Sequence, residues 1–367
     1  ERTTSALLGV YNHPKYSTII KKKTIFYDNA LIKVYDIPIF YLPKLSHPDP
    51  TVERRSGFLP PSISDTKNLG SSIFIPYFFA ISDDKNFTLT NRVFTKENPL
   101  FLGEYHQAFK NSNFFADFGY TDGYKKTSSS KKPGQKSHFF AKFVKNFIGE
   151  NNSSNELDIN IQDVSNDKYL KLYKIESNLV DYNNDVLENS IDFTHTSENL
   201  FLGVKSSIYE RLNSSNDDKY EYIFPDAFFY KNLLSNDFGN LNLLSEINFR
   251  NYDTNKETKF FTNSFDWKSS NIQTNYGFSS KILANLKNIN YETKNVDVYK
   301  NEPSTEIYGA LGFLSDLNLQ KISGNFKQFL TPKLLIRYAP GSMRKETGGS
   351  RLDLSKAFSM NKADDTN

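Results

Sequence analysis

Residues 34–85 read VYDIPIFYLPKLSHPDPTVERRSGFLPPSISDTKNLGSSIFIPYFFAISDDK. This stretch contains half of the chain's 14 prolines, and it separates a short apolar N-terminal part from a long series of alternating segments. Pro60, Pro61 and Pro76 lie inside what otherwise read as two consecutive strands. Because proline has no N–H to donate to a ladder, it is tolerated at sheet edges, at bulges or where pairing is weak. We therefore predict a junction here, followed by two strands that both have a defect in their pairing.

The composition of the 367-residue chain narrows the class of protein. Hydrophobic residues make up 38% of the chain and the mean hydropathy is −0.57, yet 15% of the residues are aromatic. No stretch approaches the roughly 18 consecutive apolar residues that a spanning helix needs. The composition argues against disorder and against a helical membrane protein. It fits a transmembrane barrel, in which only alternate residues face lipid, and it also fits a large soluble β-protein.

Charge and cysteine content exclude further classes. The net charge is +3, from 45 basic and 42 acidic residues, so no overall field indicates a nucleic-acid partner. We interpret the two basic runs, residues 21–23 and 125–136, as solvated turns or loops. The absence of cysteine excludes disulfides and thiol-ligated metals within the chain. Because the chain begins at Glu1 and carries no secretory leader, we expect it to be an excerpt of a longer protein.

From residue 57 to residue 340 the sequence alternates with a period of two. In Phe87–Val93 the odd positions are mostly apolar and the even ones polar, and Leu157–Gln162 follows the same rule. This period predicts strands rather than helices. We find about fifteen such segments, each near the roughly 9 to 11 residues of a tilted membrane strand. Short and long polar connections alternate as in an outer-membrane barrel, although a soluble sandwich or solenoid also permits them.

The sequence shows no catalytic or metal-binding pattern. Five histidines are scattered, without a close pair or an i, i+4 spacing: His13, His47, His106, His138 and His195. There is no Gly-rich phosphate loop and no G-x-S-x-G nucleophile motif. Acidic residues between 181 and 192 offer no fixed pair of carboxylates for acid–base catalysis. We therefore expect a protein that is not an enzyme and that holds neither a metal nor a cofactor.

The 32 Phe and 22 Tyr residues allow two interpretations. Aromatic side chains suit pleated, half-buried strands. They also form girdles where membrane strands meet the lipid boundary. In a barrel, the candidates for such a girdle would be Tyr77, Phe79, Phe94, Tyr105 and Tyr338.

One motif in the junction is long, ordered and unusual in composition. Its residues are Arg54, Arg55, Ser56, Gly57, Phe58 and Leu59, followed by Pro60 and Pro61. Pro38–Pro43 precedes the motif and Ile75–Phe79 follows it. Together they resemble the junction in the organic solvent tolerance family, outer-membrane proteins that assemble lipopolysaccharide. Weaker similarities to the family occur at Pro14–Ser17, Tyr27–Ala30, Leu330–Lys333 and Arg337–Pro340.

The resemblance implies an all-β fold in two parts. Residues 1–50 would be the C-terminal rungs of a periplasmic β-jelly-roll domain. Residues 51–367 would be the N-terminal part of a large transmembrane β-barrel with antiparallel strands, in the outer membrane. The barrel would be incomplete, because the chain stops before the family's closing strands.

The resemblance also implies a function. In the family, the jelly-roll receives lipopolysaccharide from a periplasmic bridge protein (LptA-like), and the barrel passes it to the outer leaflet through a lateral gate between its first and last strands. An outer-membrane lipoprotein (LptE-like) plugs the lumen, and outer-membrane lipids surround the barrel. The family has one proline in each of its first two strands. Pro76 matches the second, and either Pro60 or Pro61 matches the first.

Alternatives remain open at each of these points. A general porin or receptor barrel would share the strands, and a barrel-borne lipid hydrolase would need a Ser/His constellation that the sequence does not provide. Arg54 and Arg55 could bind lipopolysaccharide phosphates, or they could anchor the junction to carboxylates and backbone carbonyls. The prolines could weaken a gate, or they could only end strands at a domain boundary.

Overall fold

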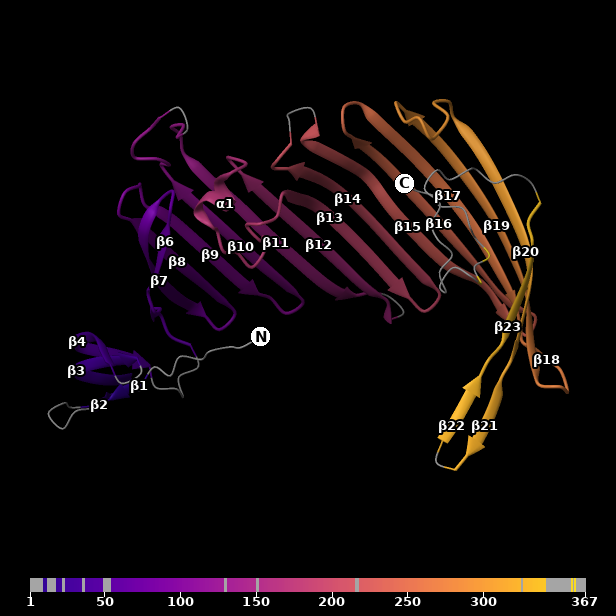
Figure 1. Cartoon of the computed structure of the whole chain (residues 1–367), viewed down its shortest axis with the longest axis horizontal. Helices are drawn as coiled ribbons and strands as arrows, with labels where there is room; N and C mark the ends of the chain where they lie inside the picture. Colours follow the sequence, from indigo (N-terminus) through magenta and orange to yellow (C-terminus); the bar gives the residue numbers. More distant parts are fainter. Residues whose placement is uncertain are drawn as a thin grey trace.

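The computed structural model describes residues 9–11, 18–21, 24–34, 37–48, 54–128, 131–149, 152–214, 218–324 and 326–340, together with Phe358 and Met360. Most of these residues lie in strands (Figure 1). The all-β fold that the sequence predicts is therefore confirmed. Within the described ranges, no helix is long and apolar enough to cross a membrane.

Four strands near the N-terminus form a small sheet of their own. They are β1 (Gly9–Tyr11), β2 (Thr18–Lys21), β3 (Thr24–Val34) and β4 (Ile37–Pro48). β3 pairs with each of the other three, always antiparallel. The predicted domain boundary between residues 50 and 51 lies outside the described residues.

The second sheet is much larger. It begins with β5 (Gly57–Phe58) and β6 (Ser62–Thr66), which both pair with the next strand. The following strands pair with their neighbours in chain order: β7 (Gly70–Ser82), β8 (Lys85–Phe94), β9 (Leu100–Ala108), β10 (Ser112–Thr121), β11 (Lys136–Ile148), β12 (Ser154–Val164), β13 (Val186–Ser197), β14 (Leu200–Arg211), β15 (Tyr220–Asn236), β16 (Gly239–Tyr252), β17 (Lys256–Ser269), β19 (Phe278–Lys294) and β20 (Ser304–Leu317).

Two further strands complete this sheet. The short β18 (Ile272–Gln273) pairs with β19 beyond the end of β17, and β23 (Lys333–Tyr338) pairs with β20. β5 and β6 lie end to end beside β7, and β17 and β18 lie end to end beside β19. The 17 described strands of this sheet therefore fill 15 side-by-side positions. This agrees with the count of about fifteen alternating segments in the sequence.

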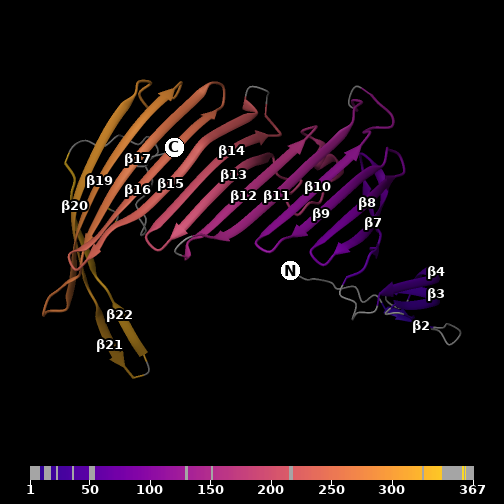
Figure 2. The ribbon, with the colours of Figure 1, turned by 180° about the vertical axis from the view of Figure 1, so that it is seen from behind.

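The strands of the large sheet follow one another in the order of a barrel. No residue pairing among them joins β23 to β5 or β6. Figures 1 and 2 show β7 and β20 at opposite ends of a curved, open sheet. Between β20 and β23, β21 (Leu319–Ser323) and β22 (Phe326–Leu330) form a separate hairpin. The expected large antiparallel sheet is confirmed, and it is unclosed among the described strands.

Alternate residues of the large sheet point to opposite faces, as the pleat requires. We call the face that carries the only described helix the inner face. The outer face is apolar and exposed at Ile73, Ile75, Val93, Phe101, Phe118, Phe139, Ile161, Ile191, Val204, Phe261, Leu286 and Leu311. The inner face carries polar side chains, among them Arg92, Glu104, Asp117, His138, Lys142, Asp158, Asp192, Lys205, Thr262 and Lys287. An apolar outside and a polar inside are what a membrane barrel with a wet lumen requires.

The connections differ between the two rims of the sheet. Two-residue turns at 83–84, 198–199 and 237–238 lie on one rim. The longest loops, 122–135 and 165–185, lie on the opposite rim (Figure 1). The small sheet and the β21–β22 hairpin extend from the short-turn rim (Figure 1).

Loop 165–185, which we call the inner loop, folds over the inner face of the first strands. It contains α1 (Tyr169–Tyr173), which ends at Lys174 in the left-handed conformation with φ 48°. The main buried cluster of the described residues forms here and consists of Leu69, Phe94, Leu100, Phe140, Val164, Tyr169, Leu170, Tyr173, Ile175, Val180, Leu187 and Leu212. The prediction of Phe94 as a girdle residue is wrong, because its ring points inward and is covered by this loop.

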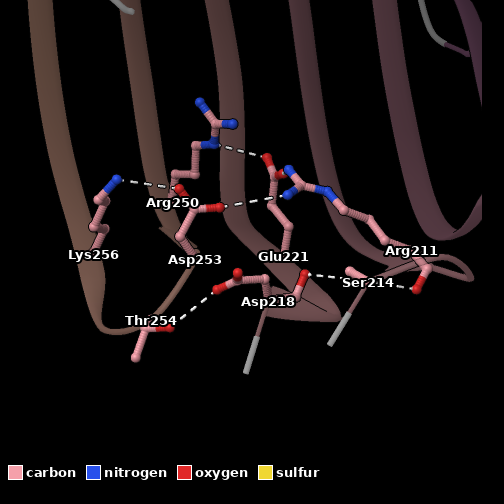
Figure 3. A network of polar contacts seen from close by, with 8 residues as sticks. All are labelled: Arg211, Ser214, Asp218, Glu221, Arg250, Asp253, Thr254 and Lys256. Atoms are coloured by element: carbon pink, nitrogen blue, oxygen red, sulfur yellow. Dashed lines mark hydrogen bonds and ion pairs between the residues drawn. The ribbon is translucent and has the colours of Figure 1, made fainter. Parts of the chain in front are cut away.

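Ion pairs join the ends of later strands on the long-loop rim (Figure 3). Arg211 lies 3.1 Å from Glu221 and 3.4 Å from Asp253, and Arg250 lies 2.7 Å from Glu221. Lys256 reaches Asp253 at 3.2 Å. Each partly exposed pair contributes little by itself, but the network fixes the spacing of β14 to β17 at this rim.

Candidate functional site at the first strands

The junction motif fastens the chain to β7. β5 pairs with β7 at Gly57–Phe58. Just before β5, Ser56 Oγ accepts a hydrogen bond from Ala80 N at 2.9 Å. Just after β5, Leu59 N donates to Pro76 O at 3.0 Å. The motif therefore lies along the edge of the large sheet.

Arg54 holds the start of this edge. Its Nη1 donates to the backbone carbonyl of Asp83, at 2.7 Å, in the turn between β7 and β8. This contact is the one that the anchoring interpretation expects. Contact of Arg54 or Arg55 with a substrate stays a prediction.

Pro60 and Pro61 lie in the break between β5 and β6. The register of β5 with β7 and that of β6 with β7 differ by one residue. The three residues between β5 and β6 therefore lie opposite only two residues of β7. One extra residue on one strand is the geometry of a bulge, which bends the strand and leaves its backbone unpaired. Both prolines are exposed there.

Pro76 lies opposite the same break. In an antiparallel ladder, a hydrogen-bonded pair of residues exchanges two N–H···O bonds. Leu59 N bonds to Pro76 O, but Pro76 has no N–H to return to the Leu59 carbonyl. Pro60 and Pro61 lack donors as well. The structure thus brings the three predicted prolines to one place on the edge, and their role as a gate stays a prediction.

An aromatic row runs along the outer face beside the break. The ring centroids of Phe58 and Tyr77 are 4.8 Å apart and those of Tyr77 and Phe79 4.6 Å apart. The row continues to Phe87 at 5.8 Å and then to Phe118 at 6.1 Å. Phe58 is 74% exposed at the edge. Apolar surface is therefore continuous from the edge into the sheet.

The inner face beside the break holds a buried arginine that the sequence analysis missed. Arg92 Nε donates to Ser72 Oγ at 3.1 Å, and its Nη1 donates to the carbonyl of Tyr173 at the end of α1. The guanidinium lies over the rings of Phe74 and Phe94, at 4.3 and 4.8 Å from their centroids. Two oxygen acceptors and two ring faces therefore surround the buried charge.

A second buried polar group fixes α1. His138 Nε2 lies 3.0 Å from Asp117 Oδ1, and its Nδ1 lies 3.1 Å from Tyr169 Oη. Burial raises the pKa of the Tyr169 phenol, and burial likewise raises the pKa of Tyr173 to about 12. Gly119 gives the ring of His138 its space, because a Cβ there would lie 2.5 Å from His138 Cε1.

The basic run 125–136 folds onto the turn at 95–99. Glu97 Oε1 accepts a hydrogen bond from Lys131 Nζ at 2.8 Å, and its Oε2 accepts one from Lys125 N at 2.9 Å. Burial opposes ionisation of Glu97, but these two bonds outweigh it and lower the pKa of the carboxyl. Within the described residues, 125–128 and 131–135 thus form a loop, as the sequence predicts.

Among the described residues, no group of three or more His, Cys, Asp or Glu side chains could hold a metal ion. His138 is buried in the group above, and His195 Nδ1 lies 2.7 Å from Asn155 Oδ1. His106 lies beside the ring of Phe115. His13 and the side chain of His47 lie outside the described part.

Comparison with known proteins gives the family context. No family model matches the chain. The LPS-assembly protein LptD of Legionella pneumophila (strain Lens) is 26% identical over 198 residues, which are 52% of this chain and 23% of that protein. LptD of Pseudomonas putida (strain W619) is 38% identical over 84 residues, which are 23% of this chain and 9% of that protein.

The chain is similar to LPS-assembly proteins. LptD of Pseudomonas aeruginosa (strain UCBPP-PA14) adds a match of 34% identity over 92 residues, 25% of this chain and 10% of that protein. The matches therefore span less than a quarter of each of these LptD proteins. A bacterial polysaccharide outer membrane secretin superposes with a TM-score of 0.27 at 10% identity, over 74% of this chain and 90% of that one, which is too low a score to indicate a common fold.

Proposed function

We propose that this chain is part of a non-enzymatic translocon that inserts lipopolysaccharide into the outer leaflet of the outer membrane. One observation carries the proposal: Pro60, Pro61 and Pro76 remove ladder donors at a single place on the edge of the large sheet. The similarity to LptD supports the same function.

The edge suits a lateral gate between the first and the last strands of the barrel. Lipopolysaccharide carries sugars that need water and acyl chains that avoid it, so a seam lets both conditions hold during transfer. Within lipid, no water replaces a missing backbone hydrogen bond. A ladder that already lacks donors is therefore the place where opening costs least.

The two faces of the sheet support a position in the outer membrane. The outer face is apolar at alternate residues, whereas the inner face is polar. In this orientation the short-turn rim and the small sheet would face the periplasm, because outer-membrane barrels have short periplasmic turns and longer external loops. Residues 1–50 would then belong to a periplasmic domain and residues 51–367 to the barrel.

The partners that we propose follow from this arrangement. An LptA-like bridge protein would deliver lipopolysaccharide to the periplasmic domain. An LptE-like lipoprotein would occupy the polar lumen, and outer-membrane lipids would cover the outer face. We propose neither a metal nor a cofactor.

Photo-crosslinking in cells that carry the full-length protein tests the gate. Probes replace Phe58 and Ile63, which both point outward at the edge and are 74% and 81% exposed. The matched control is a probe at Phe261, which also points outward but lies on β17, a strand paired on both sides, and is 40% exposed. We expect lipopolysaccharide on the two edge probes and not on the control.

Equal capture at edge and control probes, or no capture at either in cells that still assemble their outer leaflet, would contradict the gate. A general porin or receptor barrel would give this result, since it shares the strands but needs no edge without donors. The similarity to LPS-assembly proteins does not favour that alternative.

A further inference from the structure

The buried contacts of Arg92 do not end at the inner loop. Ser72 Oγ, which accepts the bond from Arg92 Nε, also donates to the backbone carbonyl of Ser64 at 3.2 Å. Ser64 and Ser72 are direct partners in the ladder between β6 and β7. A continuous polar path therefore runs from Tyr173 O through Arg92 and Ser72 to β6, the edge strand beyond the proline break.

We propose that Arg92 is a positioning residue that latches the edge strand β6 to the inner loop. Docking of the loop and pairing of β6 would then be coupled: each is stronger when the other is in place. The proposal rests on the proposed function only in calling this edge a gate. The latch itself follows from the contacts of Arg92.

The coupling follows from the cost of a buried charge. Arg92 is 1% exposed, and its guanidinium is held by two neutral oxygens and two ring faces. Hydrogen bonds from a charged donor are stronger than neutral ones, and a buried charge that loses an acceptor is costly. If the inner loop leaves, Arg92 loses Tyr173 O and its cover. The guanidinium is then open to water, which competes with Ser72 Oγ for Nε and weakens the path to β6.

The edge is where one such anchor counts most. β6 is five residues long and pairs on one side only among the described strands. β5, on the other side of the break, contributes two residue pairs. Short edge segments open locally with small free energies, so the loss of a single side-chain contact changes their opening by a large factor.

Hydrogen exchange on the full-length protein in lipid nanodiscs tests the latch. Arg92→Met removes both bonds, and we expect amides in 62–66 and in 169–175 to exchange about tenfold faster. Ser72→Ala removes the acceptor of Arg92 Nε and the bond to Ser64 O, but it keeps the bond from Arg92 to Tyr173 O. Amides in 62–66 should therefore exchange faster, while 169–175 loses less protection than in Arg92→Met. Arg250→Met, an arginine in the rim network, is the matched control and should change neither segment.

Two results would overturn the latch. One is faster exchange in the inner loop alone in Arg92→Met, which would make Arg92 an anchor of the loop only. The other is unchanged exchange of 62–66 in Ser72→Ala. The serine variant is decisive if Arg92→Met does not fold, because it leaves the guanidinium and its contact with α1 in place.

The crosslinking probe at Phe58 separates this proposal from the proposed function. Faster exchange of β6 without lipopolysaccharide capture at Phe58 would support the latch and overturn the gate. Capture at Phe58 with unchanged exchange in both variants would support the gate and overturn the latch.

Discussion

The first and the later strands of the large sheet have similar outer faces but different pairing. Every residue of β16, from Gly239 to Tyr252, pairs with β17 in one uninterrupted register. At the other end, β5 and β6 pair with β7 in two registers that differ by one residue, across a break that holds two prolines. Apolar residues cover the outer face in both regions. The first strands therefore differ from the later ones in donors and register, and not in hydrophobicity.

A proline in the uninterrupted ladder should have the largest effect. Ser245→Pro removes a donor in the middle of β16, between two paired neighbours, and we expect a cost of several kcal/mol because no water replaces the lost bond in lipid. The full-length protein should then fail to reach its folded form, measured by the mobility of unheated samples in detergent gels. Ser245→Ala is the control and should fold. Normal folding of the proline variant would show that the two ladders do not differ in strength.

A methyl group at Gly119 should have the next largest effect, because the inner face of the first strands is closely packed. The new Cβ would lie 2.5 Å from His138 Cε1 and 2.8 Å from Tyr169 Oη. We expect Gly119→Ala to weaken docking of the inner loop by about 1–3 kcal/mol. Limited proteolysis within 165–185 measures this.

The control for that variant is a glycine on the inner face of a later strand. At Gly203 a Cβ would lie 3.6 Å from the ring of Phe201, which is an ordinary contact. Gly203→Ala should leave the proteolysis pattern unchanged. Similar patterns in both variants would show that the inner loop is not packed more tightly than the open part of the face.

Restoring a donor at the break should have a moderate effect. Pro76→Ala supplies an N–H opposite the Leu59 carbonyl, and one added ladder bond is worth about 1 kcal/mol. Amides of β5 should then exchange roughly fivefold more slowly. Pro99→Ala, in a turn outside the ladders, is the control. Unchanged exchange in Pro76→Ala would mean that the missing donor does not weaken the edge.

The smallest effect is that of high pH on the inner loop. Burial raises the pKa of Tyr173 from its ordinary value near 10 to about 12. Between pH 10 and pH 12 the phenol therefore keeps its proton in the docked loop and loses it in the undocked loop. The contribution of the neutral Tyr173 phenol to docking of the inner loop is complete below about pH 10, and it is lost as the pH rises through about 12.

Proteolysis of the loop should therefore accelerate across this pH range, and less so in Tyr173→Phe, which cannot ionise. The rate of the same protease on an unstructured peptide corrects for its own pH dependence. An equal acceleration in both proteins would assign the effect to another group.

The sequence predicts the large sheet well because each strand has one apolar and one polar face. The alternation in Leu157–Gln162, for example, is carried by β12, in which Ile159 and Ile161 point outward. The prolines also report their place directly, since a residue without an N–H is confined to edges and bulges. Both signals are local in the chain.

The inner loop could not be predicted in the same way. α1 has only five residues, YLKLY, and all but the lysine are apolar or aromatic. Over that length such a pattern does not distinguish a helix from a strand. In the sequence, Arg92 is one polar position in an alternating segment. No residue near it indicates that its partner is the carbonyl of Tyr173, 81 residues away. Phe94 is a candidate for the lipid boundary in the sequence for the same reason, because the loop that covers it is distant in sequence.

Gly119 gives the inner loop a signature that can be searched for in other genomes. It is the direct ladder partner of His138, and the tyrosine that contacts this histidine lies 31 residues further along. In a chain with glycine and histidine at these paired positions, and tyrosine in the loop after the next strand, we expect that loop to fold against the inner face and to fill part of the lumen. In a chain with a larger residue in place of the glycine, the loop could not dock in this way, and we expect a wider lumen.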